Sequence, residues 1–178
     1  NPEEVAMELW YRLLNAGFRL GISAGTDSFT NVTDHYVPGG HRVYAHLPGS
    51  RLNYAEWLTA YKQGRTFATN GPMLWLKVQG KEPGEELKLP AGKHTLPVTV
   101  ELKSRVPVEA VELVVNGKVL SPAPATVTLE RSAWIAARVK GPWDRLVLND
   151  PEQRAHTSPV YVRVGDTALA NQEDVQFW

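Results

Sequence analysis

The spacing of apolar residues changes near Gly71, and this change constrains the fold more than any other feature of the sequence. From Leu74 onward, short runs of alternating apolar and polar residues are separated by turn signals such as Asn116-Gly117. The runs that we expect to form strands are 74–78, 98–102, 111–115, 118–120, 127–129, 135–139, 146–148 and 160–164. About seven or eight such strands within ~100 residues favour an immunoglobulin-like antiparallel β-sandwich.

Residues before Gly71 follow the pattern of an α/β segment instead. A helix is expected from Pro2, with acidic residues at its positive end and Gly17 as its stop. A short strand over 18–24 follows. After a polar stretch that holds a second strand at 42–46, Asn53 and Glu56 predict another helix start.

These patterns predict an α+β chain of three parts. Residues 1–71 form terminal α/β elements, residues 72–168 form the β-sandwich, and residues 169–178 begin a helix that is cut short. Both ends have the pattern of interrupted elements, so we expect more of the α/β part to lie upstream of Asn1.

Composition excludes several classes of function. The 178 residues carry 19 basic and 19 acidic side chains, and this balance argues against a nucleic-acid partner. The chain has no cysteine, which excludes disulfides and thiolate chemistry. No apolar stretch approaches the ~20 residues of a membrane span. A cytoplasmic and an exported location both fit this composition.

Asp27 is the leading candidate for chemistry. It is the last residue of the run Ser-Ala-Gly-Thr-Asp at 23–27, which begins within the last two residues of the strand expected over 18–24. A carboxylate at the carboxyl end of a strand suits a divalent ion, and the neighbouring glycine leaves room for a substrate. The alternative is that Asp27 caps a turn, as aspartate often does.

Other polar residues near Asp27 support two interpretations each. His35, His41 and His46 follow it closely and carry the commonest zinc ligand, although their separations also suit solvated loop residues. Arg42 and Arg65 have guanidinium groups that suit an anionic substrate, or surface ion pairs with glutamates.

Serine catalysis has no support. Ser23 and Ser158 both lack the Gly-x-Ser-x-Gly turn of a hydrolase nucleophile.

Several of these segments, taken in order, resemble one known family. The matching segments are 11–19, 23–27, 38–44, 64–72, 115–117, 132–138 and 155–162. Together they resemble the carboxyl-terminal part of metallohydrolases of the PHP (polymerase and histidinol phosphatase) superfamily, in the carbaryl-hydrolase-like branch often labelled CehA/McbA. The resemblance covers nearly the whole chain.

The resemblance implies a distorted α/β barrel whose two or three divalent ions (Zn, Mn or Fe) activate water. Its substrates would be small phosphoesters, or amides and carbamate esters. Asp27 matches the aspartate of the family's last Asp-x-His motif, whereas Phe29 stands where the histidine belongs. The family's earlier histidine ligands are absent from these 178 residues. We therefore expect Asp27 to be a ligand in a longer parent protein, and this chain alone to be inactive.

A non-catalytic role is the rival interpretation. In it the β-sandwich binds a glycan or a protein partner, and the six tryptophans supply aromatic surface or core anchors. In either case an incomplete barrel would leave apolar surface exposed, so self-association is expected.

Overall fold

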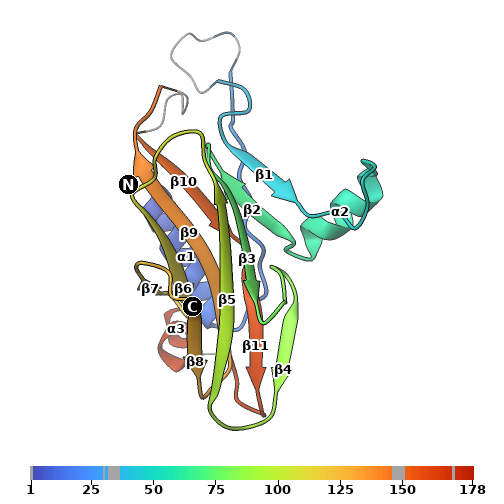
Figure 1. Ribbon diagram of the computed structural model, residues 1–178, viewed down its shortest axis with the longest axis vertical. Coiled ribbons are helices and arrows are strands. Elements are labelled where there is room, and N and C mark those ends of the chain that lie inside the picture. The colour runs from blue at the N-terminus through green and yellow to red at the C-terminus, as the bar shows by residue number, and fades with distance from the viewer. Residues whose placement is uncertain (1, 30, 32–36, 146–150, 170) are drawn as a thin grey trace.

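The computed structural model describes residues 2–29, 31, 37–145, 151–169 and 171–178. These residues form a mixed α+β structure dominated by antiparallel β-sheets (Figure 1). The helices are α1 (Pro2–Asn15), α2 (Tyr54–Lys62) and α3 (Gln172–Phe177). The strands are β1 (Arg42–Ala45), β2 (Thr66–Thr69), β3 (Met73–Val78), β4 (Glu86–Leu89), β5 (His94–Lys103), β6 (Ala110–Val115), β7 (Lys118–Leu120), β8 (Thr126–Leu129), β9 (Ala133–Pro142), β10 (Glu152–Thr157) and β11 (Val160–Val164).

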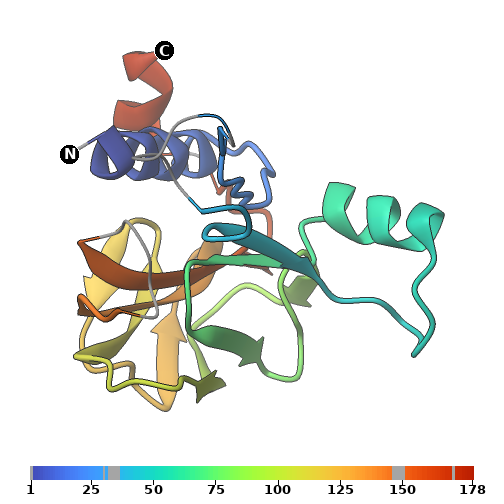
Figure 2. The ribbon, with the colours of Figure 1, turned by 90° about the horizontal axis from the view of Figure 1, so that it is seen from above.

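The strands form two sheets packed face to face, as in a β-sandwich (Figure 2). The larger sheet has the order β1-β2-β10-β9-β11-β4, with β6 and β7 added beside β9, and the smaller has the order β3-β5-β8. All pairs are antiparallel except β4 with β11. The position near Gly71 at which the period changes falls between β2 and β3, which lie in different sheets, and β2 pairs with β10 of the sandwich.

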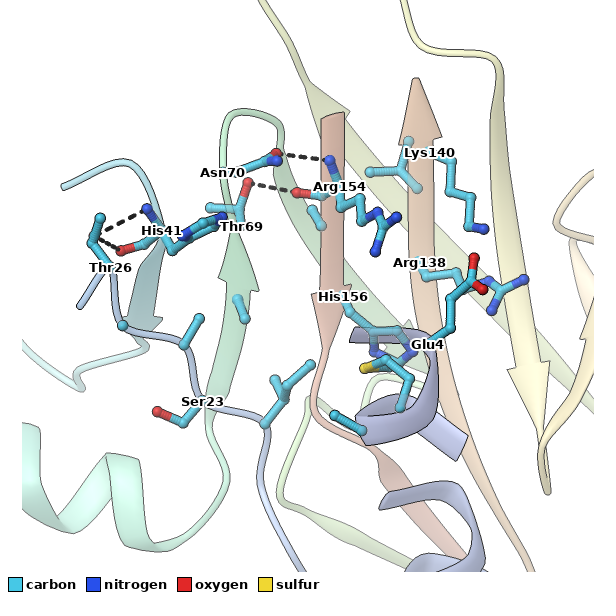
Figure 3. Close-up of a pocket in the computed structure, with 18 of the residues that line it drawn as sticks. Glu4, Ser23, Thr26, His41, Thr69, Asn70, Arg138, Lys140, Arg154 and His156 are labelled. Atoms are coloured by element: carbon cyan, nitrogen blue, oxygen red, sulfur yellow. Dashed lines mark hydrogen bonds between the residues drawn. The ribbon is translucent and has the colours of Figure 1, made fainter. Parts of the chain in front are cut away.

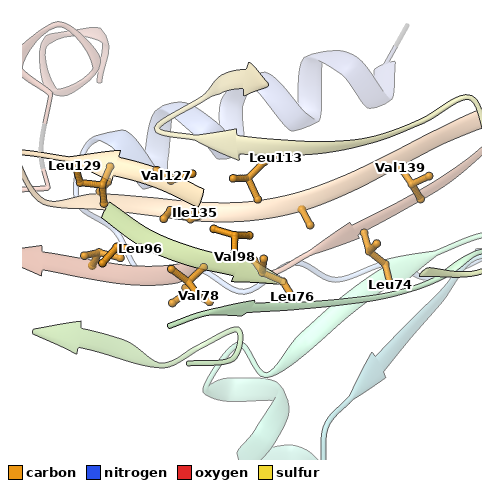
Figure 4. Packing of buried hydrophobic residues seen from close by; sticks show 14 of the residues in the cluster. Leu74, Leu76, Val78, Leu96, Val98, Leu113, Val127, Leu129, Ile135 and Val139 are labelled. Carbon is orange, nitrogen blue, oxygen red and sulfur yellow. The ribbon is translucent and has the colours of Figure 1, made fainter. Parts of the chain in front are cut away.

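The core lies between the two sheets (Figure 4). Leu74, Leu76 and Val78 alternate with exposed residues along β3 and point inward, as their period of two predicts. Opposite them lie Leu113, Ile135 and Val139 from the larger sheet.

Helix α1 lies on the outer face of the larger sheet, beside α3 (Figure 2). Leu14 is buried there with Trp134 and Tyr161, in a second apolar cluster. The helix ends as predicted, because Gly17 adopts a φ of +95° that few other residues tolerate. The Gly17 N–H donates to the Leu14 carbonyl, and the Phe18 N–H donates to the Leu13 carbonyl. Asn1, the residue before this helix, lies outside the described residues.

Polar contacts tie both terminal helices to the sheet. Trp134 Nε1 donates to Asn15 Oδ1 at 2.7 Å, and Asn15 Nδ2 donates to the buried Asp174 of α3 at 3.0 Å. Arg12 adds an ion pair to Asp174 at 3.1 Å. The predicted helix at the end of the chain is therefore present as α3, with Asn171 as its N-cap.

The strand predicted over residues 18–24 is wrong, because this segment pairs with no strand in the part of the chain that the structure describes. Side chains take up its backbone groups instead. Ile22 N–H donates to Ser158 Oγ at 2.9 Å, and Thr66 Oγ1 donates to the Ile22 carbonyl at 2.8 Å. An alternating pattern predicts a strand only if a partner strand lies beside it, and here side-chain hydroxyls contact the backbone of Ile22.

Most of the other expected helices and strands are present in the structure. Strands form at all the other predicted positions except 146–148, which lies outside the described residues. Helix α2 begins after Asn53, whose Oδ1 accepts from Ala55 N–H and Glu56 N–H as the capping pattern predicts. Strands β2, β4 and β10 were not predicted. None of the described helices has the length and apolar character needed to cross a membrane.

Candidate functional site

A cavity of about 680 Å³ lies between α1, residues 22–27 and the outer face of the larger sheet (Figure 3). This volume is within the ~300–1,000 Å³ typical of small-molecule sites. Most of its surface is apolar. The polar and charged side chains that line it include Glu4, Glu8, Asp27, His41, Arg138, Lys140, Arg154 and His156.

Strands β9 and β10 present a block of basic side chains to this cavity. Arg154 lies directly opposite Lys140 in the strand register, and His156 lies directly opposite Arg138. Residues two apart on a strand share a face, so all four side chains lie on the outer face. Figure 3 shows that Arg138, Lys140 and Arg154 extend toward the same region.

Of the three cations Arg138, Lys140 and Arg154, the two arginines each form an ion pair with a glutamate. Arg138 Nε donates to Glu112 at 2.6 Å, and Arg154 donates to Glu152 at 2.6 Å. The Arg154 hydrogen bond is the main cause that lowers the pKa of Glu152, with Lys140 a weaker one. Lys140 makes no ion pair with any of the residues that the structure describes.

His156 is buried beneath α1 and is held at both ring nitrogens. Its Nδ1 lies 2.7 Å from the Thr157 carbonyl, which can only accept, so Nδ1 carries the proton. The Nε2 atom therefore accepts from the Tyr11 hydroxyl of α1 at 2.6 Å. The pKa of His156 is lowered to about 4, mainly by burial, with the nearby charge of Arg138 as a weaker cause. Burial also disfavours the charged form of Tyr11, and it therefore raises the pKa of this tyrosine.

The opposite wall of the cavity is residues 22–27, and a close backbone contact fixes its path. Gly21 lies against Gly64, where a Cβ on Gly21 would come within 2.7 Å of the Gly64 Cα. The hydroxyls of Thr66 and Ser158 then bind the backbone of Ile22. Because the Thr66 hydroxyl proton is donated to the Ile22 carbonyl, the Ser158 hydroxyl is the donor in the 2.7 Å hydrogen bond between the two side chains. Any side chain at residue 21 would push this wall away from the sheet.

Asp27 and His41 both line the cavity. The Thr26 hydroxyl donates to the His41 carbonyl at 2.9 Å and accepts from its N–H at 3.1 Å, which ties the two segments together. Asp27 is exposed and has φ +49°, a conformation that aspartate tolerates better than most residues. The structure thus brings Asp27 and one of the three nearby histidines to the same cavity.

These residues do not complete a metal site. Within the described ranges, no group of three or more His, Cys, Asp or Glu side chains is placed to hold an ion. A carboxylate and an imidazole are suitable donors for Zn, Mn or Fe, but catalytic zinc takes three protein ligands. An ion at Asp27 would therefore need ligands from outside these residues.

The other predicted site residues lie apart from this cavity. Arg42 Nη1 donates to the Gly39 carbonyl at 3.0 Å, and Arg65 lines a separate mixed-charge pocket near Glu85. His46 pairs with Glu82 at 2.6 Å. His35 lies outside the described residues.

Sequence reasoning missed the basic block on β9 and β10. Its signal is present as two pairs of residues two apart, Arg138 with Lys140 and Arg154 with His156. Strand β10 was not predicted, so the second pair had no strand to lie on. Which pairs come to face each other depends on the register, which the sequence alone does not specify.

Comparisons with known proteins identify no relative: no family model, no curated protein and no solved structure matches this chain.

Proposed function

We propose that this chain is the carboxyl-terminal part of a metal-dependent hydrolase of the PHP type, with the last elements of a barrel followed by an immunoglobulin-like sandwich. In this proposal Asp27 is one metal ligand of the whole protein, and small phosphoesters, amides or carbamate esters are the substrates. The observation that carries it is that Asp27 and His41 both line one cavity of small-molecule size.

The surrounding geometry supports such a role for Asp27. Asp27 follows a wall that two buried hydroxyls anchor at Ile22, and the hydroxyl of the preceding residue, Thr26, is bound to the His41 backbone. Gly25, two residues before Asp27, lines the same cavity and has open space where a side chain would begin. Because the described residues hold no complete ligand set, the proposal assigns the remaining ligands to an upstream segment.

The test uses the complete reading frame that contains this chain. Asp27→Asn should lower both the bound metal and the hydrolysis of phosphoester and carbamate-ester probes. Asp166→Asn, at another exposed aspartate on the turn after β11, should change neither. Full activity and full metal content in the Asp27→Asn protein would refute the assignment. So would a reading frame with no His-x-His pair upstream of residue 1.

An aromatic surface favours the rival, a glycan-binding sandwich. Trp75 on β3 is 37% exposed, and it contacts Phe67, which stacks on Tyr44 at 5.1 Å. Exposed aromatic faces of this kind suit sugar rings. Glycan-array binding that Trp75→Ala removes, and that Trp143→Ala at a more exposed tryptophan leaves intact, would favour this second function.

A further inference from the structure

A second pocket, of about 530 Å³, lies where four segments of the chain meet, and it shares no lining residue with the cavity beneath α1. These segments are 19–21, 62–65, 81–86 and 158–161. Cations reach the pocket from three of them. Arg19 follows α1, Lys62 is the last residue of α2 and Arg65 comes just before β2, while Lys81 lies between β3 and β4. The volume is again within the ~300–1,000 Å³ typical of small-molecule sites.

Glycines allow these segments to pack backbone against backbone. A Cβ on Gly21 would come within 2.7 Å of the Gly64 Cα, and a Cβ on Gly84 would clash with the Gln63 carbonyl. Gly64 itself has φ +69°, which glycine adopts far more readily than other residues. The cations of the pocket therefore extend from closely packed backbone segments, which fixes where their side chains begin.

The carboxylates of this pocket already have cationic partners. The lining holds four cations and two carboxylates, Glu85 and Glu86. Glu86 pairs with Arg19 and also with Arg163, which lies on β11. Glu85 pairs with Lys81 at 3.5 Å. Both carboxylates are thus matched without any contribution from segment 62–65.

Lys62 and Arg65 are the two cations that remain. Neither side chain forms an ion pair or a hydrogen bond with any residue that the structure describes. The carboxyl end of α2 does not compensate them, because its last carbonyls already accept from the backbone N–H groups of residues 63–65. The next carboxylate on the same turn, Glu82, is itself paired with His46 and Lys77. The described charges therefore leave two positive charges at this pocket for a ligand.

Two unmatched positive charges suit a phosphate dianion, since a phosphate monoester carries about −1.5 to −2 charges at pH 7. The planar guanidinium of arginine and the point charge of lysine are both common phosphate-binding groups. We propose that this pocket binds a phosphate dianion, either free or as part of a small phosphomonoester, between Arg65 and Lys62. This inference is independent of the hydrolase proposal, because it uses no residue of the Asp27 cavity and no metal.

Glu85 supplies a test of sign. Its carboxylate lines the pocket and opposes an incoming anion, so Glu85→Gln should strengthen phosphate binding. The substitution keeps a side-chain oxygen, which can still accept from the Glu82 N–H as Glu85 does at 2.8 Å. Tighter binding is a result that damage to the fold does not produce.

The experiment is calorimetric titration of the 178-residue chain with inorganic phosphate, phenyl phosphate and the monoanion benzoate, in EDTA. Both phosphates should bind more tightly than benzoate. Arg65→Gln should weaken phosphate binding roughly tenfold because it removes a charge-assisted contact, and Lys62→Gln, at a more exposed site, should weaken it about threefold. Arg105→Gln and Lys118→Gln remove exposed cations outside this pocket, and these matched controls should bind as the wild type does.

The two phosphates distinguish the sources of the dianion. Tighter binding of phenyl phosphate would assign the site to a phosphomonoester, and equal or weaker binding would assign it to phosphate itself, and both results support the proposal.

Other outcomes overturn it. Unchanged phosphate binding in Arg65→Gln, or weaker binding in Glu85→Gln, would show that these charges do not select the ligand. Tighter binding of benzoate than of either phosphate would refute the dianion. Absence of binding by both phosphates at millimolar concentration would mean that the pocket is not a site of this kind. Because EDTA is present, failure here leaves the metal test of Asp27 unaffected.

Discussion

Acid should weaken this fold through His156, the histidine that α1 covers. In the folded protein the pKa of His156 is lowered from 6.5 to about 4, mainly by burial, whereas the unfolded chain keeps an ordinary histidine. As the pH falls below 6.5, the unfolded chain therefore takes up a proton that the folded chain refuses. The stabilisation is fully present above pH ~6.5 and is lost progressively down to pH ~4.

The size of this effect follows from the two pKa values. A difference between 6.5 and about 4 corresponds to about 3 kcal/mol in the free energy of unfolding when the whole range is crossed. Between pH 7 and pH 5 the loss is about 2 kcal/mol. The groups around the ring oppose its charge, since Arg138 is a cation and Tyr11 already donates its proton to Nε2.

Urea denaturation followed by tryptophan fluorescence at pH 7, 6 and 5 measures this loss. In His156→Gln the dependence on pH over this range should become shallower by about 2 kcal/mol, whatever the variant's absolute stability. His94→Gln, at a histidine outside this cluster, is the matched control and should keep the wild-type slope. An NMR titration of the histidine ring protons should show one ring that stays neutral at pH 5. Wild-type and His156→Gln slopes that coincide would refute the reasoning.

Three further predictions concern the packing of the sandwich. Asn15→Ala leaves the buried Trp134 N–H without its acceptor, so the free energy of unfolding should fall by ~1–3 kcal/mol, as measured by urea denaturation at pH 7, and an unchanged value would contradict the assigned contact. Gly84→Ala should destabilise the protein more than Gly80→Ala in thermal denaturation. Both glycines have positive φ, but only the new Cβ at residue 84 would clash with a backbone carbonyl, that of Gln63. Equal melting temperatures of the two variants would show that this clash relaxes freely. Leu76→Ala removes a fully buried side chain between the sheets and should cost ~2–5 kcal/mol by the same urea assay, while a loss below ~1 kcal/mol would mean that the core closes over the space.

The predicted fold was largely correct where a short-range pattern decides it. Alternation along β3 predicts its buried side because the side-chain period of a strand is two, and the Asn116-Gly117 turn places β6 beside β7. Gly17 and Asn53 mark helix ends for equally local reasons. By contrast, whether residues 18–24 pair as a strand depends on a distant partner, and here two hydroxyls from β2 and the β10–β11 turn occupy that place.

The candidate site was harder to predict for the same reason. Asp27 and His41 are close in sequence, so local reasoning linked them, and the structure places both at one cavity. The basic block on β9 and β10 arises from a register between segments that the sequence separates, and its histidine is held by Tyr11 of α1, 145 residues away. Arg42 and Arg65 were proposed from charge alone, and they lie outside this cavity.

The metal content of the protein made from the complete reading frame tests the central proposal most directly. After exhaustive dialysis, elemental analysis should find Zn, Mn or Fe bound in the wild type and in Asp166→Asn. It should find at least one equivalent less in Asp27→Asn, with hydrolysis of the ester probes lost in parallel. Equal metal content and equal hydrolysis in the wild type and Asp27→Asn would contradict the proposal that Asp27 is a ligand of a PHP-type site.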